Sequence, residues 1–332
     1  MLRVIILWIL LLALTFALAC NSSTEPSETF ISQVSVISTS TGSVVAEIDL
    51  GYVLNTRIRI SSDGNYAYVV SVYGDDQVIQ IDCLSQTVSG TLTFGSSGFC
   101  GDLCLNHEGT ELYALFPGVI YMVDTPSLTV TDTMSLSGIS GPPIAHRPGT
   151  SLVYVPQNDS LLCTLVIDTE LGSVVDTLDF HTWNMAFSET GSELYIYQSG
   201  SLICLDPDTG EEIVSTGIEH LSEICLVPGS NTLYVSWWEF GNFGESGVIA
   251  LDRSTLAVTD SLKVTGGVPR LCYVPGLNQL YITGGDSSII VADLPGLDLA
   301  GEIDIDHEVL GIASSPSGDF VYCSIHYDNL TD

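Results

Sequence analysis

A strand pattern built around one tyrosine recurs seven times along this chain of 332 residues. Each copy begins with a turn that carries Gly or Asn, continues into a short apolar segment with the tyrosine, and is followed by an apolar strand that usually ends in Asp. Turn residues of this kind supply the backbone angles of tight hairpins. The tyrosines are 39 to 47 residues apart and lie at Tyr68, Tyr113, Tyr154, Tyr195, Tyr234, Tyr281 and Tyr322.

Four short strands in a unit of about 40 residues are typical of a β-propeller blade. No segment shows a sustained i, i+3, i+4 apolar face, so helices are not predicted. A solenoid of the same period would need capping units. We therefore predict an all-β fold, a seven-bladed β-propeller with four-stranded antiparallel blades, over residues 31–332.

The two ends of the chain predict how the ring closes. Tyr322 is so close to Asp332 that the seventh copy lacks its third and fourth strands. Residues 34–48 align without a gap on residues 78–92, which are the third and fourth strands of the first copy. We expect the N-terminal strands to complete the last blade, because closure covers sheet edges that would otherwise aggregate.

The repeats resemble the YVTN-type seven-bladed propellers, a group that includes surface-layer repeats and periplasmic YncE-like proteins and is WD40-like in its repeat architecture. The resemblance rests on the turn Ser62-Asp63-Gly64, on Tyr-Val pairs and on Ile-Asp strand endings such as Ile81-Asp82. It covers residues 31–326. It implies the fold and says little about activity, because propellers host many functions, lactonase-like and amine-dehydrogenase-like ones included.

Residues 1–19 are interpreted as a lipoprotein signal peptide. Arg3 provides the positive charge, and the apolar run that follows it is short for a membrane span. The run ends in Phe16-Ala17-Leu18-Ala19 before Cys20, which resembles a bacterial lipobox with a lipidated cysteine. An ordinary secretory signal with an incidental cysteine is the alternative. Residues 20–30, which are mostly polar between positions 21 and 29, are predicted to form a flexible tether. We expect an extracytoplasmic protein, lipid-anchored to a bacterial membrane on its periplasmic or cell-surface side.

The charge balance excludes some partners. The chain has 40 acidic and 7 basic residues, a net charge of -33. Nucleic-acid binding needs clustered Lys and Arg, so no nucleic-acid partner is predicted. A solvated surface explains the acidity, and we expect a monomer. Eight cysteines follow Cys20 without CxxC spacing, and no nucleotide, zinc or Ser-His-Asp motif is found, so no cofactor and no metal are predicted.

One position in each copy is predicted to lie at the mouth of the central channel. The innermost strand has a small residue at its middle, Cys or Ala in six copies, and we interpret Cys104, Cys225 and Cys272 as core thiols. Cys100, near a connecting loop, is the more plausible reactive or pairing thiol. Two residues before the small position, five of the seven residues are polar or charged. These mouth positions are Arg57, Asp102, Pro143, Asn184, Glu223, Arg270 and Gly311.

Arg57 and Arg270 belong to the first and sixth copies, with only Gly311 between them around the ring. Two guanidinium groups at one mouth could clamp an anion through paired hydrogen bonds. The alternative is that both arginines neutralise Asp102 and Glu223 in a filled channel. His181, His220 and His307 also lie in connections between blades and are interpreted as loop histidines, because separate blades seldom bring ligands within metal-binding distance.

Aromatic residues are predicted beside the arginines. Trp237, Trp238, Phe240 and Phe243 occur among glycines in the longest insertion, between the second and third strands of the fifth copy, and Trp183 lies on the same side. They could stack on a sugar or a peptide, or pack against a neighbouring blade. Our hypothesis is that the two arginines and the loop with Trp237, Trp238, Phe240 and Phe243 line one concavity.

The predicted function is a binding or scaffold module at the cell envelope rather than an enzyme. Its ligand would be a glycan, a peptide or a small anion. The alternative is a lactonase-like propeller hydrolase or lyase with its site at the channel mouth.

Overall fold

The computed structural model describes residues 30–51, 55–71, 76–95, 101–139, 143–157, 162–239, 245–284 and 287–328. Within these ranges the chain forms strands and turns, and contains no helix that could cross a membrane. Residues Phe30–Tyr327 form one compact unit.

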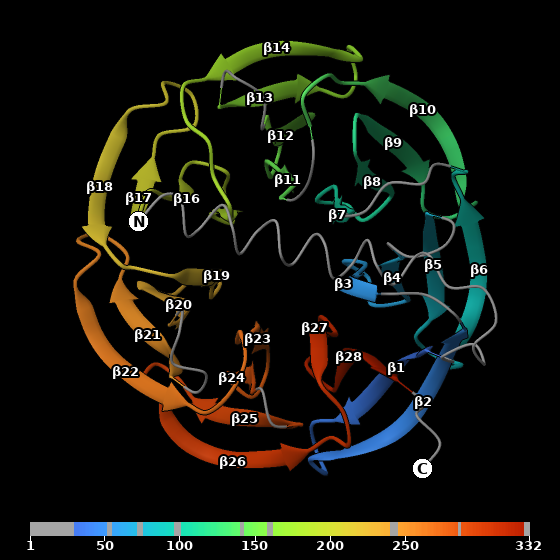
Figure 1. The fold of residues 1–332 in the computed structure, drawn as a ribbon, viewed down its shortest axis with the longest axis vertical. Helices are drawn as coiled ribbons and strands as arrows, with labels where there is room; N and C mark the ends of the chain where they lie inside the picture. The colour runs from blue at the N-terminus through green and yellow to red at the C-terminus, as the bar shows by residue number, and fades with distance from the viewer. Residues whose placement is uncertain are drawn as a thin grey trace, which may run out of the picture. The chain divides into compact units, whose positions relative to one another are not determined.

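This unit is a seven-bladed β-propeller, as the repeat predicts (Figure 1). Each blade is a four-stranded antiparallel sheet whose first strand lies near the central axis. Blade 1 consists of β3 (Asn55–Ile60), β4 (Tyr66–Ser71), β5 (Gln77–Asp82) and β6 (Thr87–Thr93). Blade 2 consists of β7 (Asp102–Leu105), β8 (Glu111–Phe116), β9 (Val119–Asp124) and β10 (Thr129–Ser135). Blade 3 consists of β11 (Ala145–His146), β12 (Leu152–Gln157), β13 (Cys163–Asp168) and β14 (Ser173–Leu178).

Blades 4 to 6 follow the same order. Blade 4 consists of β15 (Met185–Phe187), β16 (Leu194–Gln198), β17 (Ser201–Leu205) and β18 (Glu212–Gly217). Blade 5 consists of β19 (Leu221–Leu226), β20 (Thr232–Trp238), β21 (Ser246–Asp252) and β22 (Val258–Val264). Blade 6 consists of β23 (Leu271–Val274), β24 (Gln279–Thr283), β25 (Ser288–Asp293) and β26 (Asp298–Asp304).

Blade 7 joins the two ends of the unit. Its strand order is β27 (Val309–Ser314), β28 (Phe320–Asp328), β1 (Phe30–Ser38) and β2 (Ser43–Gly51). The Thr39 hydroxyl donates to the Gly318 carbonyl over 2.8 Å, and the Thr39 amide donates to the Asp319 carbonyl over 3.0 Å. The predicted composite blade is therefore confirmed.

The position of a strand in its blade determines its burial. In β4 every residue from Ala67 to Ser71 is buried, because a second strand packs against a neighbouring blade on both of its faces. The outer strand β6 is largely exposed and is rich in Thr and Ser. Gly64, in the turn between β3 and β4, has a φ of 74°, and the equivalent glycine of every other blade also has a positive φ. The glycine-containing turns thus repeat with the strands.

The anchor tyrosines link each blade to the next. All seven are buried. The Tyr154 hydroxyl of blade 3 donates to the Pro207 carbonyl in blade 4, and the Tyr234 hydroxyl of blade 5 donates to the Pro295 carbonyl in blade 6 over 2.8 Å. The ring-closing link has the same form, because the Tyr322 hydroxyl donates to the carbonyl of Cys83 in blade 1 over 3.5 Å. One residue per repeat therefore supplies both core volume and contact between blades.

Candidate functional site

The channel mouth is built from the residues that precede each inner strand. Asp102 is 2% exposed and accepts hydrogen bonds from its neighbour Leu103 and from the Ile144 amide of blade 3. The Glu223 carboxylate of blade 5 likewise accepts a hydrogen bond from the following blade, from the Leu271 amide of blade 6 over 2.9 Å. Ile144 and Leu271 each follow the mouth position of the next blade. These carboxylates therefore join adjacent blades, in addition to any role toward a ligand.

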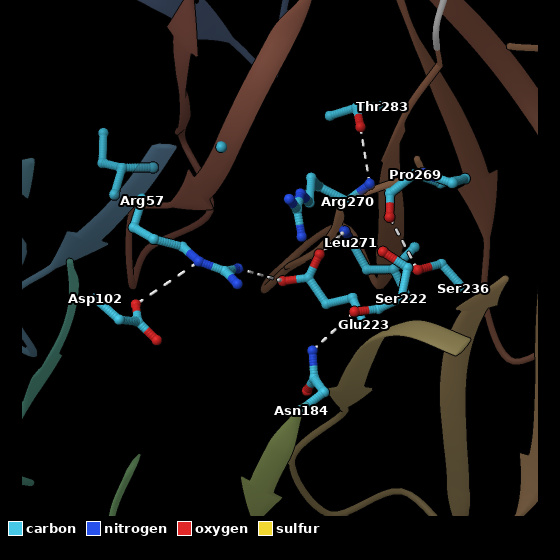
Figure 2. Close-up of polar contacts among 12 residues, drawn as sticks. Arg57, Asp102, Asn184, Ser222, Glu223, Ser236, Pro269, Arg270, Leu271 and Thr283 are labelled. Carbon is cyan, nitrogen blue, oxygen red and sulfur yellow. Dashed lines mark hydrogen bonds and ion pairs between the residues drawn. The ribbon is translucent and has the colours of Figure 1, made fainter. Parts of the chain in front are cut away.

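Asn184 makes a comparable link. Its side-chain amide donates to the carbonyl of Ser222 in blade 5 over 2.8 Å (Figure 2). Three of the polar mouth positions are thus held in place by backbone groups of the following blade. A rigid rim of this kind is what a positioned binding site requires.

Arg57 extends across the channel from blade 1 (Figure 2). Its guanidinium lies 3.7 Å from the Asp102 carboxylate and 4.0 Å from that of Glu223. Arg59, the only large residue at the small position of the inner strands, lies 4.0 Å from Asp102 as well. The neutralising interpretation therefore describes Arg57. Arg59 was not predicted to belong to the mouth, although an arginine at a position that is Cys or Ala in the other six blades could have indicated it.

Arg270 has a different environment. Its backbone amide donates to the Thr283 hydroxyl over 2.8 Å, and its carbonyl accepts from the Thr283 amide. Its half-buried side chain extends toward Arg57 (Figure 2). In the part of the chain that the structure describes, no carboxylate lies within 4 Å of its guanidinium. Burial and the positive charge of Arg57 lower the pKa of Arg270, against the opposing effect of Glu223 and Asp102.

The charges at the mouth do not balance. Arg57, Arg59 and Arg270 face two carboxylates, Asp102 and Glu223. The five groups carry one excess positive charge, in a chain whose net charge is -33. A concentrated positive charge surrounded by low-dielectric walls attracts anions.

The tryptophans lie at or near the same end of the blades, in different environments. Trp183 is 67% exposed and its ring meets His181 edge-on at 5.0 Å. Trp237 and Trp238 are half-buried and belong to β20 itself. Trp237 covers Gly247 on β21, where an added Cβ would lie 2.8 Å from the indole nitrogen. The packing alternative therefore accounts for Trp237, and Trp183 is left as an exposed aromatic surface.

The end of β20 is tied to the Arg270 connection. The buried Ser236 hydroxyl donates to the Pro269 carbonyl over 2.9 Å (Figure 2). This side-chain-to-backbone hydrogen bond links the strand that carries Trp237 and Trp238 to the residue before Arg270. Phe240 and Phe243 lie outside the described residues, as do Cys20 and Cys100.

The inner-strand cysteines are enclosed between blades. Cys104 and Cys272 are buried, and Cys225 is partly buried beside them in the ring. Burial raises the pKa of the Cys272 thiol to about 12, so it is protonated at neutral pH. No group of three or more His, Cys, Asp or Glu side chains could hold a metal ion within the described ranges.

Comparisons with known proteins identify the fold. No family model matches the chain, and no curated protein sequence matches it. A hydrazine synthase chain of Kuenenia stuttgartiensis is 17% identical with a TM-score of 0.67, covering 84% of this chain and 96% of that one. A chain of the mitotic checkpoint complex is 16% identical with a TM-score of 0.68, covering 93% and 96%. The Cps50 (Swd1) β-propeller domain of Myceliophteria thermophila is 12% identical with a TM-score of 0.63, covering 82% and 96%.

Proposed function

We propose that this chain is a ligand-binding or scaffold propeller of the YVTN/YncE-like group, anchored outside the cytoplasm through lipid on Cys20, and that its channel mouth binds a small anion. The Arg270 guanidinium carries the proposal, because it is half-buried beside Arg57 without a carboxylate within 4 Å among the described residues. The propeller fold is compatible with a binding module, and the similar structures include chains of protein complexes.

Physical chemistry favours an anion at this place. A half-buried guanidinium beside another is stabilised by a counter-charge, and a planar carboxylate matches its paired donors. Arg57 is held by Asp102 and Glu223, so Arg270 is the group whose donors face a ligand. The exposed ring of Trp183 adds a surface on which a sugar could stack. An acidic sugar is therefore the ligand chemistry that the described residues fit best.

We expect Arg270→Ala to weaken binding of glucuronate at least tenfold, because one charge-assisted pair of hydrogen bonds contributes about 1.5–3 kcal/mol. Titration calorimetry on the full chain with glucuronate and neutral glucose measures this. Lys263→Ala is the matched control, since it also removes one positive charge but from an exposed strand. Failure of the unaltered protein to bind glucuronate, or equal loss in both variants, would contradict the anion site.

Cys20→Ala is expected to release the protein from membranes, because a lipobox cysteine is the only attachment that the sequence predicts. Fractionation of bacteria that express the two forms, with mass spectrometry of the mature N-terminus, measures the effect. A Cys20→Ala protein that still sediments with membranes would show that another segment or partner holds it there.

A further inference from the structure

At the end of the propeller opposite the channel mouth, an arginine from blade 5 lies between blades 4 and 5. We call the space between two adjacent blades at this end a groove. Arg253 directly follows Asp252 at the end of β21. Its guanidinium lies 2.6 Å from the Glu193 carboxylate of blade 4 and 5.9 Å from the centre of the Tyr195 ring. Glu193 stands two residues before the anchor tyrosine. The groove between blades 4 and 5 is therefore a filled guanidinium site.

The groove between blades 3 and 4 also holds an arginine, but this one comes from the earlier of the two blades. Arg147, directly after β11, forms two hydrogen bonds of 2.6 and 3.1 Å with the Asp208 carboxylate of blade 4. It also donates to the Gly191 carbonyl. Asp208 lies two residues after Asp206, which directly follows β17. A guanidinium again joins two neighbouring blades at this end of the propeller.

The groove between blades 2 and 3 has the same acidic positions but lacks the arginine. Glu111 stands two residues before Tyr113 and is thus equivalent to Glu193, while Glu170 is equivalent to Asp208. The arginine positions hold Thr169 in place of Arg253 and Asn106 in place of Arg147.

A cavity of about 450 Å³ lies in this groove. We call it the blade 2–3 cavity. Its lining includes Glu108, Glu111 and Tyr113 from blade 2, and His146, Thr169 and Glu170 from blade 3. None of its lining residues is Lys or Arg. Its volume falls in the range of small-molecule sites, which is roughly 300–1,000 Å³.

Two aromatic rings, those of Tyr113 and His146, line the cavity. The Tyr113 and His146 rings are stacked, with centroids 5.8 Å apart and planes inclined by 9°. The Tyr113 hydroxyl donates to the Glu111 carboxylate, which fixes that side chain. Burial lowers the pKa of His146, so its ring is neutral at pH 7 and leaves the cavity without a positive charge.

We propose that the blade 2–3 cavity binds a guanidinium group, from free arginine or from an arginine side chain of a partner protein. The equivalent residues in the blade 4–5 groove bind the guanidinium of Arg253, which shows that a carboxylate two residues before the anchor tyrosine suits this group. The carboxylates of Glu111 and Glu170 line the cavity. Carboxylates match the planar, paired donors of a guanidinium better than the point charge of an ammonium group. This site is independent of Arg270 and of the channel mouth.

The test uses titration calorimetry on the full chain in 150 mM salt, which screens general attraction to so acidic a protein. The probes are free arginine, the end-blocked tripeptide Gly-Arg-Gly, and citrulline as the neutral analogue of arginine. We expect arginine or the tripeptide to bind and citrulline to bind at least tenfold more weakly. Binding of the tripeptide alone identifies a protein partner, and binding of free arginine alone identifies the amino acid. Absence of arginine binding in both forms, equal binding of citrulline, or displacement of arginine by Ca²⁺ would overturn the proposal.

Two variants locate the site. Thr169→Arg should place a guanidinium where Arg253 lies in the blade 4–5 groove, abolish binding, and raise the melting temperature. Glu111→Gln keeps an oxygen acceptor for the Tyr113 hydroxyl and should weaken binding at least tenfold. Glu219→Gln is the matched control, because it removes the same charge from an exposed connection at the other end of the blades. Unchanged binding in a folded Thr169→Arg protein, or in a Glu111→Gln protein that melts like the parent, would refute the site.

Discussion

Deletion of residues 30–51, which form β1 and β2, is expected to make the protein aggregate and to remove its cooperative thermal transition. The deletion exposes the edge of β28, and unpaired edges recruit other chains. It also removes Val34 and Val36, which are fully buried in one cluster with Ile58 and Tyr322. Light scattering and thermal melting measure the result. A deletion protein that stays monodisperse and melts at the parental temperature would contradict closure by these strands.

A pair of point variants separates packing from general strand damage. Val36→Asp places a carboxylate at a position that is 0% exposed and should cost several kcal/mol, about as much as an unpaired buried polar group. Val45→Asp makes the same change in β2 at a position that is 49% exposed, and should change stability by about 0.5 kcal/mol or less. Equal melting temperatures for the two variants would show that β1 is not packed as described.

The fold could be predicted because equivalent positions in the seven repeats have the same structural role. The gapless alignment of residues 34–48 with 78–92 extends to a detail of the backbone. The pairing of β5 with β6 shifts register after Gln80, and that of β1 with β2 shifts after Val36, the residue aligned with it. A repeat that conserves both the tyrosine and the bulge constrains the strand order even where the two halves of a blade are far apart in the chain.

The grouping of the mouth residues was also predictable, because equivalent positions of a closed ring lie at one distance from its axis. Their pairing was not. Arg57 of blade 1 lies within 4.0 Å of Glu223 of blade 5. A long, flexible arginine side chain can reach several carboxylates around the channel, so the sequence does not indicate which of them it pairs with. Whether Arg270 binds an anion remains a prediction, as does stacking by Trp183.

The blade 2–3 cavity was missed for a different reason. The sequence indicates this cavity only when each repeat is compared with the next one, because the Glu of a groove and the Arg that binds it belong to successive repeats. Alignment of single repeats shows Glu111 and Glu193 as equivalent, but it does not show that only Glu193 has an arginine opposite.

The anchor tyrosines are expected to give the largest effect of any single side chain. Tyr234 is 1% exposed and packs in one cluster with Val248, Leu271 and Ile282. Tyr234→Ala should lower the free energy of unfolding by about 3–5 kcal/mol, the usual cost of removing a buried aromatic ring. The midpoint of urea unfolding measures the loss, provided that the slope with urea is unchanged.

Conservative variants then divide this effect between ring and hydroxyl. Tyr234→Phe keeps the ring and loses the hydrogen bond to Pro295, so a cost of about 1 kcal/mol is expected. Tyr281→Phe in blade 6 is the matched control, because the Tyr281 hydroxyl donates no hydrogen bond to another residue that the structure describes, and its loss should cost less. If Tyr234→Phe were as damaging as Tyr234→Ala, the hydroxyl link between blades would outweigh core packing. Equal effects of the two Phe variants would instead mean that the Pro295 hydrogen bond adds no stability, and that the tyrosine ring alone holds the blades together.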